Sequence, residues 1–88
     1  MIKVEFSKRF VKSFKKAPKK VQISFQKRSE IFISDKFNPV LNNHSLIGKY
    51  QEYRSINITG DWRAIFKEYK NGKIAYFIII DTHSNLYN

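Results

Sequence analysis

The sequence predicts an α+β fold in which a two-helix hairpin packs on an antiparallel β-sheet, in the order β-α-α-β-β-β. Apolar residues recur at helical spacing between residues 7 and 34. In the segments on either side they alternate with polar residues or form continuous runs, as in strands. The 88 residues include no Cys, so we expect one small domain over residues 1–88, without disulfide support.

The first two elements are a strand and a helix joined directly. Ile2, Val4 and Phe6 alternate with charged residues, which predicts a half-buried strand. Ser7 follows as an N-cap, so we expect a helix from there to Lys16. Its apolar stripe consists of Phe10, Val11 and Phe14.

A second helix is expected from Pro18 to about Ser34, because proline breaks the first helix and fits the first turn of the next. Val21, Phe25 and Phe32 fall on one stripe, which is the side expected to cover the sheet. The basic residues fall mostly outside that stripe, so the hairpin should have a basic outer surface.

The second half predicts a connection and three antiparallel strands. Residues 37–48 (FNPVLNNHSLIG) read as a connection. Its expected anchors in the core are Val40, Leu41, Leu46 and Ile47. Strands are expected at residues 50–59, 61–69 and 73–82, followed by a short tail.

Glycine residues mark the turns between these strands. Gly60 is expected to have a positive φ, and Asn71-Gly72 predicts a tight type I′ hairpin. The last strand is continuously apolar over residues 75–80, which predicts a central position beside the N-terminal strand.

The chain is strongly basic, with a formal net charge of +10. Eleven of its 17 Lys and Arg residues, with three acids, lie in residues 1–37. Such a field favours a polyanion or an acidic protein, although a solvated lysine-rich helix face is an alternative. No signal peptide or membrane segment is recognisable, so we expect a cytoplasmic protein with no membrane partner.

Residues suited to metal-independent RNA cleavage occur in the second half. RNA supplies its own nucleophile, the 2′-hydroxyl, so an enzyme needs a general base, a general acid and donors around the phosphate. Histidine transfers protons near neutral pH, and arginine binds phosphate through a planar fork. The candidates are His44, Arg54, Asp61, Arg63, His83 and Tyr87. With no Cys and two distant His, neither a metal site nor a cofactor is expected.

Each candidate also has an ordinary structural interpretation. The histidines could cap or lie on the surface, and the arginines could form ion pairs with nearby acids. Asp61 could simply follow Gly60 in a turn, and Tyr87 could pack with Leu86.

Two segments resemble the RelE/ParE superfamily of bacterial toxins, in particular its YafQ-like branch. They are LNNHSLIGKYQEYRSINITGDWRAIFK and DTHSNLY. The likeness is carried by His-x-Leu-x-Gly, Tyr-Arg, Asp-Trp and Thr-His-x-x-Leu-aromatic, and it extends over nearly the whole chain. Asn57 stands where the branch has another active-site histidine, and Tyr87 stands where it has phenylalanine.

The resemblance implies a type II toxin, an endoribonuclease that enters the ribosomal A site and cuts mRNA there. A cognate acidic antitoxin would restrain it. The resemblance implies catalytic positions at His44, Asp61 and His83. Two alternatives remain: a ParE-like toxin that acts on DNA gyrase without cutting nucleic acid, and an inactive member that only binds its antitoxin.

Taken together, we expect His83 to be the general acid and either Asp61 or His44 the general base. Arg63 would stabilise the phosphorane, and Tyr87 would orient a base or phosphate. The residues expected to bind RNA or the ribosome are Arg54, Asn57, Lys49, Lys19, Lys20, Lys27 and Arg28.

Overall fold

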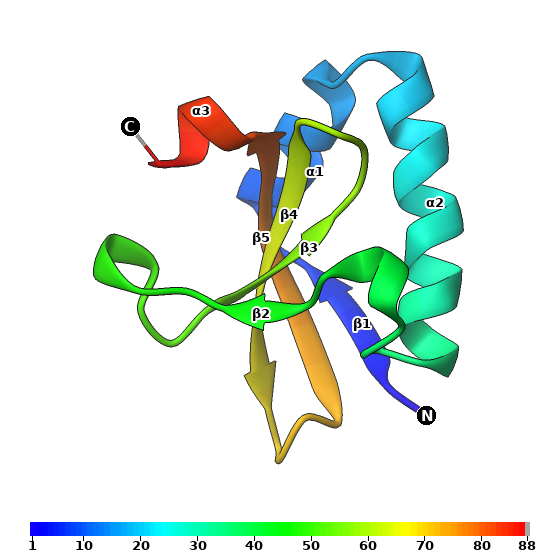
Figure 1. Ribbon diagram of the computed structural model, residues 1–88, viewed down its shortest axis with the longest axis vertical. Coiled ribbons are helices and arrows are strands. Elements are labelled where there is room, and N and C mark those ends of the chain that lie inside the picture. Colours follow the sequence, from blue (N-terminus) through cyan, green and yellow to red (C-terminus); the bar gives the residue numbers. More distant parts are fainter. Residues whose placement is uncertain (88) are drawn as a thin grey trace.

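The computed structural model describes residues 1–87 and contains a five-stranded sheet with two long helices on one face (Figure 1). The strands are β1 (Lys3–Phe6), β2 (His44–Ser45), β3 (Arg54–Asn57), β4 (Trp62–Tyr69) and β5 (Ile74–Thr82). The helices are α1 (Lys8–Lys16), α2 (Lys19–Ser34) and α3 (His83–Tyr87), with 3-10 turns η1 (Pro39–Leu41) and η2 (Gly48–Tyr50). The predicted α+β class and the two-helix hairpin are confirmed. None of the helices in this part of the chain is long and apolar enough to span a membrane.

The strand order is β1-β5-β4-β3-β2, which confirms the central position of β5 and its pairing with β1. That pairing is parallel, whereas β2, β3, β4 and β5 pair antiparallel in succession. The sheet is therefore mixed rather than wholly antiparallel. The long connection between β1 and β5, which begins with the α1–α2 hairpin, allows these two strands to run in the same direction.

Aromatic residues fill the core between the sheet and the long helices. Phe25 and Phe32 of α2 pack against Phe77 of β5, each with ring centroids 5.6 Å apart. Phe32 also lies 5.0 Å from the Phe66 ring of β4. These pairs are edge to face, the arrangement that aromatic quadrupoles favour. The predicted stripe of α2 is thus buried, whereas Val11 of α1 is 42% exposed and does not belong to the core.

A second, smaller core lies on the opposite face, and a β-bulge in β5 contributes one residue to it. Ile65 pairs with Ile79 and Phe66 pairs with Phe77, so Ile78 is an extra residue in β5. The bulge shifts the alternation of side chains, so that Ile80 faces the long helices and Ile79 faces the other side. The second core consists of Tyr50, Ile65, Ile79 and Leu86.

The connection before the sheet differs from the prediction. Leu41 is fully buried and Leu46 packs on the second core, but Val40 and Ile47 are 45% and 91% exposed and anchor nothing. The strand expected at residues 50–59 is shorter, because η2 and a left-handed Glu52 (φ 78°) precede β3. The expected tail forms α3 instead.

The Asn71-Gly72 turn forms where it was predicted, in a wider loop, and the prediction for Gly60 is wrong. Asn71 (φ 59°) and Gly72 (φ 82°) occupy the centre of a turn in which the Lys73 N–H donates to the Lys70 carbonyl over 3.2 Å. The positive φ values of Asn71 and Gly72 fit the predicted type I′ turn. However, Lys70 (φ 53°) is also left-handed and the strands pair only as far as Tyr69 and Ile74, so the loop has four residues and is wider than the predicted tight hairpin. Gly60 does not have a positive φ, so that prediction is wrong.

We expect Gly72→Ala to lower the free energy of unfolding by about 1–2 kcal/mol, because an alanine is strained in the left-handed region. The added Cβ would also lie 2.8 Å from the Lys36 Nζ, which forms a 3.0 Å ion pair with Glu68. Urea unfolding measures the loss. Gly60→Ala is the matched control, since its Cβ meets nothing within 4 Å. An equal loss in both variants would contradict this account.

Candidate functional site

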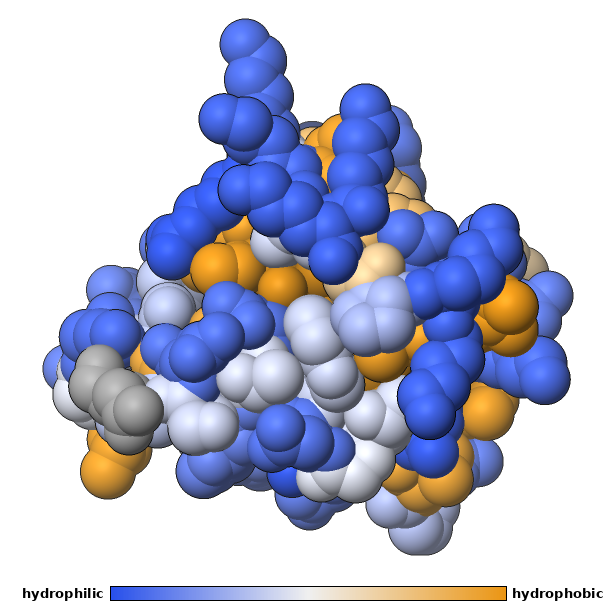
Figure 2. All heavy atoms as spheres, turned by 90° about the horizontal axis from the view of Figure 1, so that it is seen from above, coloured by the Kyte–Doolittle hydropathy of each residue, from blue (hydrophilic) through white to orange (hydrophobic). Residues whose placement is uncertain are grey.

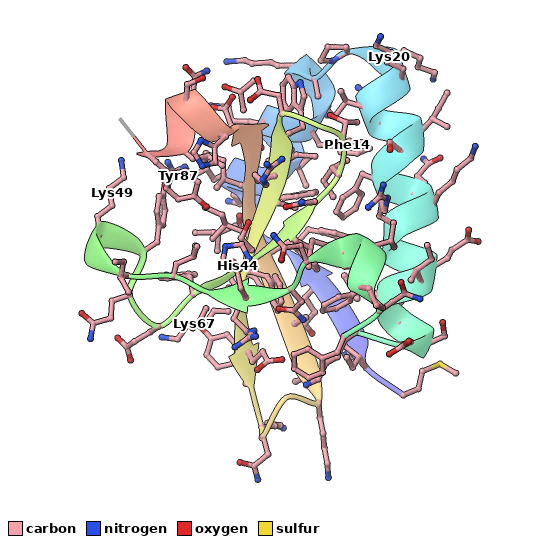
Figure 3. The ribbon with its side chains drawn as sticks, viewed as in Figure 1. Phe14, Lys20, His44, Lys49, Lys67 and Tyr87 are labelled. Carbon is pink, nitrogen blue, oxygen red and sulfur yellow. The ribbon has the colours of Figure 1, made fainter. Side chains whose placement is uncertain are left out.

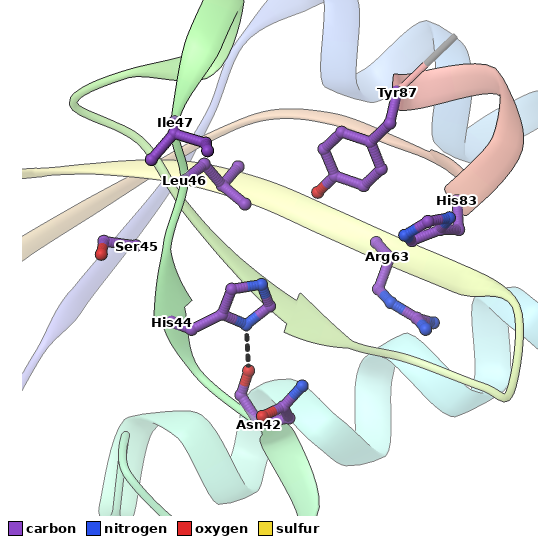
Figure 4. Close-up of a pocket in the computed structure, with 8 residues that line it drawn as sticks. All are labelled: Asn42, His44, Ser45, Leu46, Ile47, Arg63, His83 and Tyr87. Atoms are coloured by element: carbon purple, nitrogen blue, oxygen red, sulfur yellow. Dashed lines mark hydrogen bonds between the residues drawn. The ribbon is translucent and has the colours of Figure 1, made fainter.

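A pocket of about 390 Å³ lies on the face of the sheet opposite the long helices, beside α3 (Figure 4). Its lining residues are Asn42, His44, Ser45, Leu46, Ile47, Arg63, His83 and Tyr87. Four of the five residues predicted as catalytic are among them. Figure 4 shows the rings of His44, His83 and Tyr87 around a common space, with Arg63 from β4 at its side.

His44 reaches the pocket from β2, which pairs with β3 at the edge of the sheet and places His44 opposite Ser55. Its Nδ1 lies 2.7 Å from the carbonyl oxygen of Asn42. A carbonyl only accepts hydrogen bonds, so Nδ1 carries the proton in this bond. The Nε2 atom of a neutral ring is then available to accept a proton.

His83 is the first residue of α3, and its backbone N–H donates to the carbonyl oxygen of Asp61 over 2.8 Å. Its exposed ring lies against Tyr87, with centroids 4.7 Å apart and an interplanar angle of 61°. Tyr87 in turn packs edge to face on Tyr50 at 6.1 Å. The i, i+4 spacing along α3 brings the imidazole and the phenol together.

Arg63 is half-buried and held by the β3–β4 turn. Its Nη1 donates to the carbonyl oxygens of Thr59, Gly60 and Trp62 at 3.1, 3.2 and 3.0 Å. Within residues 1–87 these bonds use only Nη1, and neither of the two ion pairs includes Arg63. The Nε and Nη2 donors are therefore available to an anion in the pocket.

Asp81 and Asn85 fix the start of α3, and the sequence reasoning missed both. Asp81 Oδ1 accepts from the Thr82 N–H at 2.7 Å and from Asn85 Nδ2 at 3.1 Å. Thr82 Oγ1 accepts from the Asn85 N–H at 3.3 Å, which is an N-cap bond. The spacing of Thr82 and Asn85 is a sequence signal for the start of a helix, but the expected tail did not take it into account.

We expect Asp81→Ala to destabilise α3 and to lower the free energy of unfolding by about 1–2 kcal/mol, because two hydrogen bonds lose their charged acceptor. Asp81→Asn should cost less, since an amide oxygen can accept both bonds. Urea unfolding gives the energies, and the NMR signals of the His83 ring report its contact with Tyr87. Equal losses in the two variants would show that the charge, rather than the acceptor, matters.

Two of the six candidates for RNA cleavage, Asp61 and Arg54, lie outside the pocket. Asp61 is exposed in the β3–β4 turn, and its backbone carbonyl accepts the hydrogen bond from the His83 N–H. Arg54 pairs with Phe66 on the helix-covered side of the sheet. Its Nε donates to Asn43 Oδ1 at 2.8 Å, and its guanidinium lies 5.6 Å from the Phe37 ring centroid.

The basic residues predicted to bind RNA are spread over the molecule. Lys49 lies near the pocket, with its Nζ 5.3 Å from the Tyr50 ring, whereas Lys20 lies at the start of α2, across the molecule from Tyr87 (Figure 3). Lys19 and Lys27 are also exposed on α2. Seen from the end that carries α3 and the α1–α2 connection, long hydrophilic side chains project around apolar patches (Figure 2).

Arg28 differs from the exposed lysines because it holds three elements together. Its Nη1 donates to the carbonyl oxygen of Val40 at 2.5 Å and, more weakly, to that of Asn57 at 3.4 Å. The guanidinium thus joins α2 to η1 and β3, which is a structural role distinct from the predicted RNA contact.

Two buried polar atoms lie next to the pocket residues. Ser55 Oγ and Asn57 Oδ1 have no hydrogen-bond partner within residues 1–87. They are two positions apart in β3 and therefore face the same side, where their strand partners are His44 and Arg63. A buried polar group without a partner costs about 1–3 kcal/mol, so the strand retains polarity here at the expense of stability. In the same part of the chain, no group of three His, Asp or Glu side chains is placed to hold a metal ion.

No protein-family model matches the sequence, and no curated protein is significantly similar to it. Solved structures are similar. YafQ from E. coli strain BL21(DE3) has a TM-score of 0.80 and 23% identity, with 100% of both chains covered. A chain of the E. coli DinJ-YafQ complex has a TM-score of 0.79 and 24% identity over the same coverage. A chain of the toxin-antitoxin complex RelBE2 from Mycobacterium tuberculosis has a TM-score of 0.66 and 13% identity, covering 93% of this chain and 98% of that one. The chain therefore has the RelE-like fold.

Proposed function

We propose that this chain, which has the fold of the YafQ and RelBE2 structures, is a YafQ-like toxin of a type II toxin-antitoxin system and an endoribonuclease that cuts mRNA. The observation that carries the proposal is the pocket in which His44, Arg63, His83 and Tyr87 meet. Two titratable rings and a guanidinium are the groups that RNA transesterification needs. Residues 1–88 would form one toxin domain.

In the proposed reaction, Nε2 of His44 removes the proton of the 2′-hydroxyl, whose oxygen attacks the adjacent phosphorus. Arg63 binds the non-bridging oxygens while the new O–P bond forms and negative charge accumulates. His83 donates a proton to the 5′-oxygen as the P–O bond to it breaks. The products are a 2′,3′-cyclic phosphate and a 5′-hydroxyl, so no metal or cofactor enters the balance.

The geometry favours His44 over Asp61 as the base. The His44 ring lines the pocket and its Nδ1 bond leaves Nε2 as the acceptor, whereas Asp61 is not among the lining residues and bonds His83 through its backbone carbonyl. We assign Asp61 a supporting role at the start of α3. Asn57 can form hydrogen bonds but cannot exchange a proton, so it would orient Arg63 or the substrate.

The partners follow from charge. A net charge of +10 suits rRNA and mRNA, and we propose that the toxin works in the ribosomal A site in the cytoplasm, with Lys19, Lys20 and Lys27 contacting RNA. A cognate acidic antitoxin would neutralise this field. Chains with a similar structure occur in the E. coli DinJ-YafQ toxin-antitoxin complex and in the toxin-antitoxin complex RelBE2, which supports such a partner.

Mapping RNA 5′ ends after brief induction tests the proposal. The same message is expressed with and without its start codon, so that only one form is translated. We expect new 5′ ends in register with codons in the translated message alone. A DNA-damage response without such ends would instead support the gyrase-directed alternative, and no effect at equal expression would support an inactive antitoxin-binding protein.

A further inference from the structure

Core phenylalanines and the tyrosines lie on different faces of the sheet. The core under α1 and α2 contains phenylalanine, of which Phe66 and Phe77 are fully buried examples. All five tyrosines lie on the other face. Tyrosine combines an apolar ring with a polar end, so it suits a surface that meets water or a polar ligand.

These tyrosines and one lysine form a continuous series of contacts, the tyrosine track: Tyr87, Tyr50, Tyr53, Lys67, Tyr69 and Tyr76. The ring of Tyr50 lies 6.1 Å from that of Tyr87 and 6.3 Å from that of Tyr53. The Nζ of Lys67 lies 5.8 Å from the Tyr53 ring and 5.5 Å from the Tyr69 ring. Tyr69 and Tyr76 are 6.3 Å apart.

The track begins at the pocket and crosses the sheet. Its first ring, Tyr87, contacts His83 at 4.7 Å, and its last, Tyr76, pairs with Lys67 across β4 and β5. Figure 3 places Tyr87, Lys49 and Lys67 on the side away from α2. Tyr50 is buried and supports the track, whereas Tyr69 is 44% exposed, so the track is accessible to a ligand.

Charge identifies the ligand. Lys67 lies between two rings and Lys49 lies 5.3 Å from the Tyr50 ring, which places cations along the aromatic surface. One acid, Glu5, lies beside the last ring of the track as the strand partner of Tyr76, and it pairs with Lys3 at 3.4 Å. Aromatic rings interleaved with cations are how proteins bind single-stranded nucleic acid, through base stacking and phosphate contacts.

We propose that the tyrosine track binds the single-stranded RNA that flanks the scissile bond, with bases against Tyr53, Tyr69 and Tyr76 and a phosphate at Lys67. This inference rests on the proposed function, because it takes the pocket as the point from which the strand continues.

Binding of uncleavable 2′-O-methyl RNA of two lengths tests it. An oligonucleotide of about nine nucleotides should bind at least about 5-fold more tightly than one of about three, because it reaches the track. Tyr69→Leu and Lys67→Ala should abolish that gain and leave the affinity for the short oligonucleotide unchanged. Tyr69→Phe should retain the gain, since it keeps the ring.

Phe37→Leu is the matched control. Phe37 is 60% exposed and has the cations of Lys36 and Arg54 at 5.4 and 5.6 Å from its ring, but it lies outside the track. It should keep the gain with length. Tyr53→Leu provides a second variant if Tyr69→Leu is unfolded, and thermal unfolding of each protein checks this.

Retention of the full gain in folded Tyr69→Leu, Tyr53→Leu and Lys67→Ala variants would overturn the proposal. Weaker binding of an acidic antitoxin peptide by these variants, with RNA binding unchanged, would also overturn it by making the face a protein interface. A length-dependent gain without any mRNA cleavage would refute the proposed function and leave the track standing. Codon-registered cleavage of mRNA by a protein that shows no such gain would support the proposed function and overturn the role of the track.

Discussion

Replacing His83 with alanine is expected to lower the rate of mRNA cleavage by about 10²- to 10⁴-fold, the usual contribution of a general acid. The side chain is exposed at the start of α3, and the bond that anchors this position comes from its backbone N–H. The variant should therefore fold and still bind RNA. Single-turnover cleavage in a translating extract measures the rate, and growth after induction measures toxicity.

Ser84→Ala is the control for His83→Ala, because Ser84 is the next residue of α3 and equally exposed. It should cleave mRNA at the normal rate. Growth arrest by His83→Ala at an expression level equal to that of the unmodified protein would be incompatible with His83 as the acid.

Arg63→Ala is expected to reduce the cleavage rate by about 10²- to 10³-fold, the effect of losing one preorganised donor to the charged transition state. Arg63→Lys should recover only part of this loss, because an ammonium group keeps the charge but not the planar fork. The same cleavage assay measures both variants. Thermal unfolding must accompany it, since Arg63 also bonds three carbonyls of the β3–β4 turn.

Arg9→Ala removes the same charge from an exposed position on α1 and serves as the control for Arg63. If Arg9→Ala and Arg63→Ala reduced cleavage equally, the effect would come from net charge alone. A normal rate in a folded Arg63→Ala protein would exclude this residue from the reaction.

The two long helices and the antiparallel succession of β3, β4 and β5 could be predicted because each reflects a local pattern. The stripe of Val21, Phe25 and Phe32 and the Asn71-Gly72 turn depend on neighbours in the sequence. The 91% exposure of Ile47 could not be predicted in this way, because it depends on the direction of the chain as it enters η2. The turn at Gly60 forms without a positive φ at this residue, so the presence of glycine did not predict the backbone conformation.

The sequence predicted the types of residue in the candidate site better than their positions in space. His44, Arg63 and His83 stand out as residue types suited to RNA cleavage, and they do line one pocket. The sequence could not show whether Asp61 or Asp81 has the more important side-chain contacts near the site. The contacts that distinguish them depend on the bulge at Ile78 and on the cap of α3, which form only after distant segments meet.

The bulge at Ile78 also determines which core each substitution in β5 affects. It divides β5 into a segment before the bulge, residues 74–77, whose pattern is set by packing under the helices, and residues 79–82, which lead into the pocket. Beyond the bulge the two neighbouring residues Ile79 and Ile80 belong to different cores. A substitution at Ile79 therefore acts on the small core beside the pocket, whereas one at Ile80 acts on the packing under the helices.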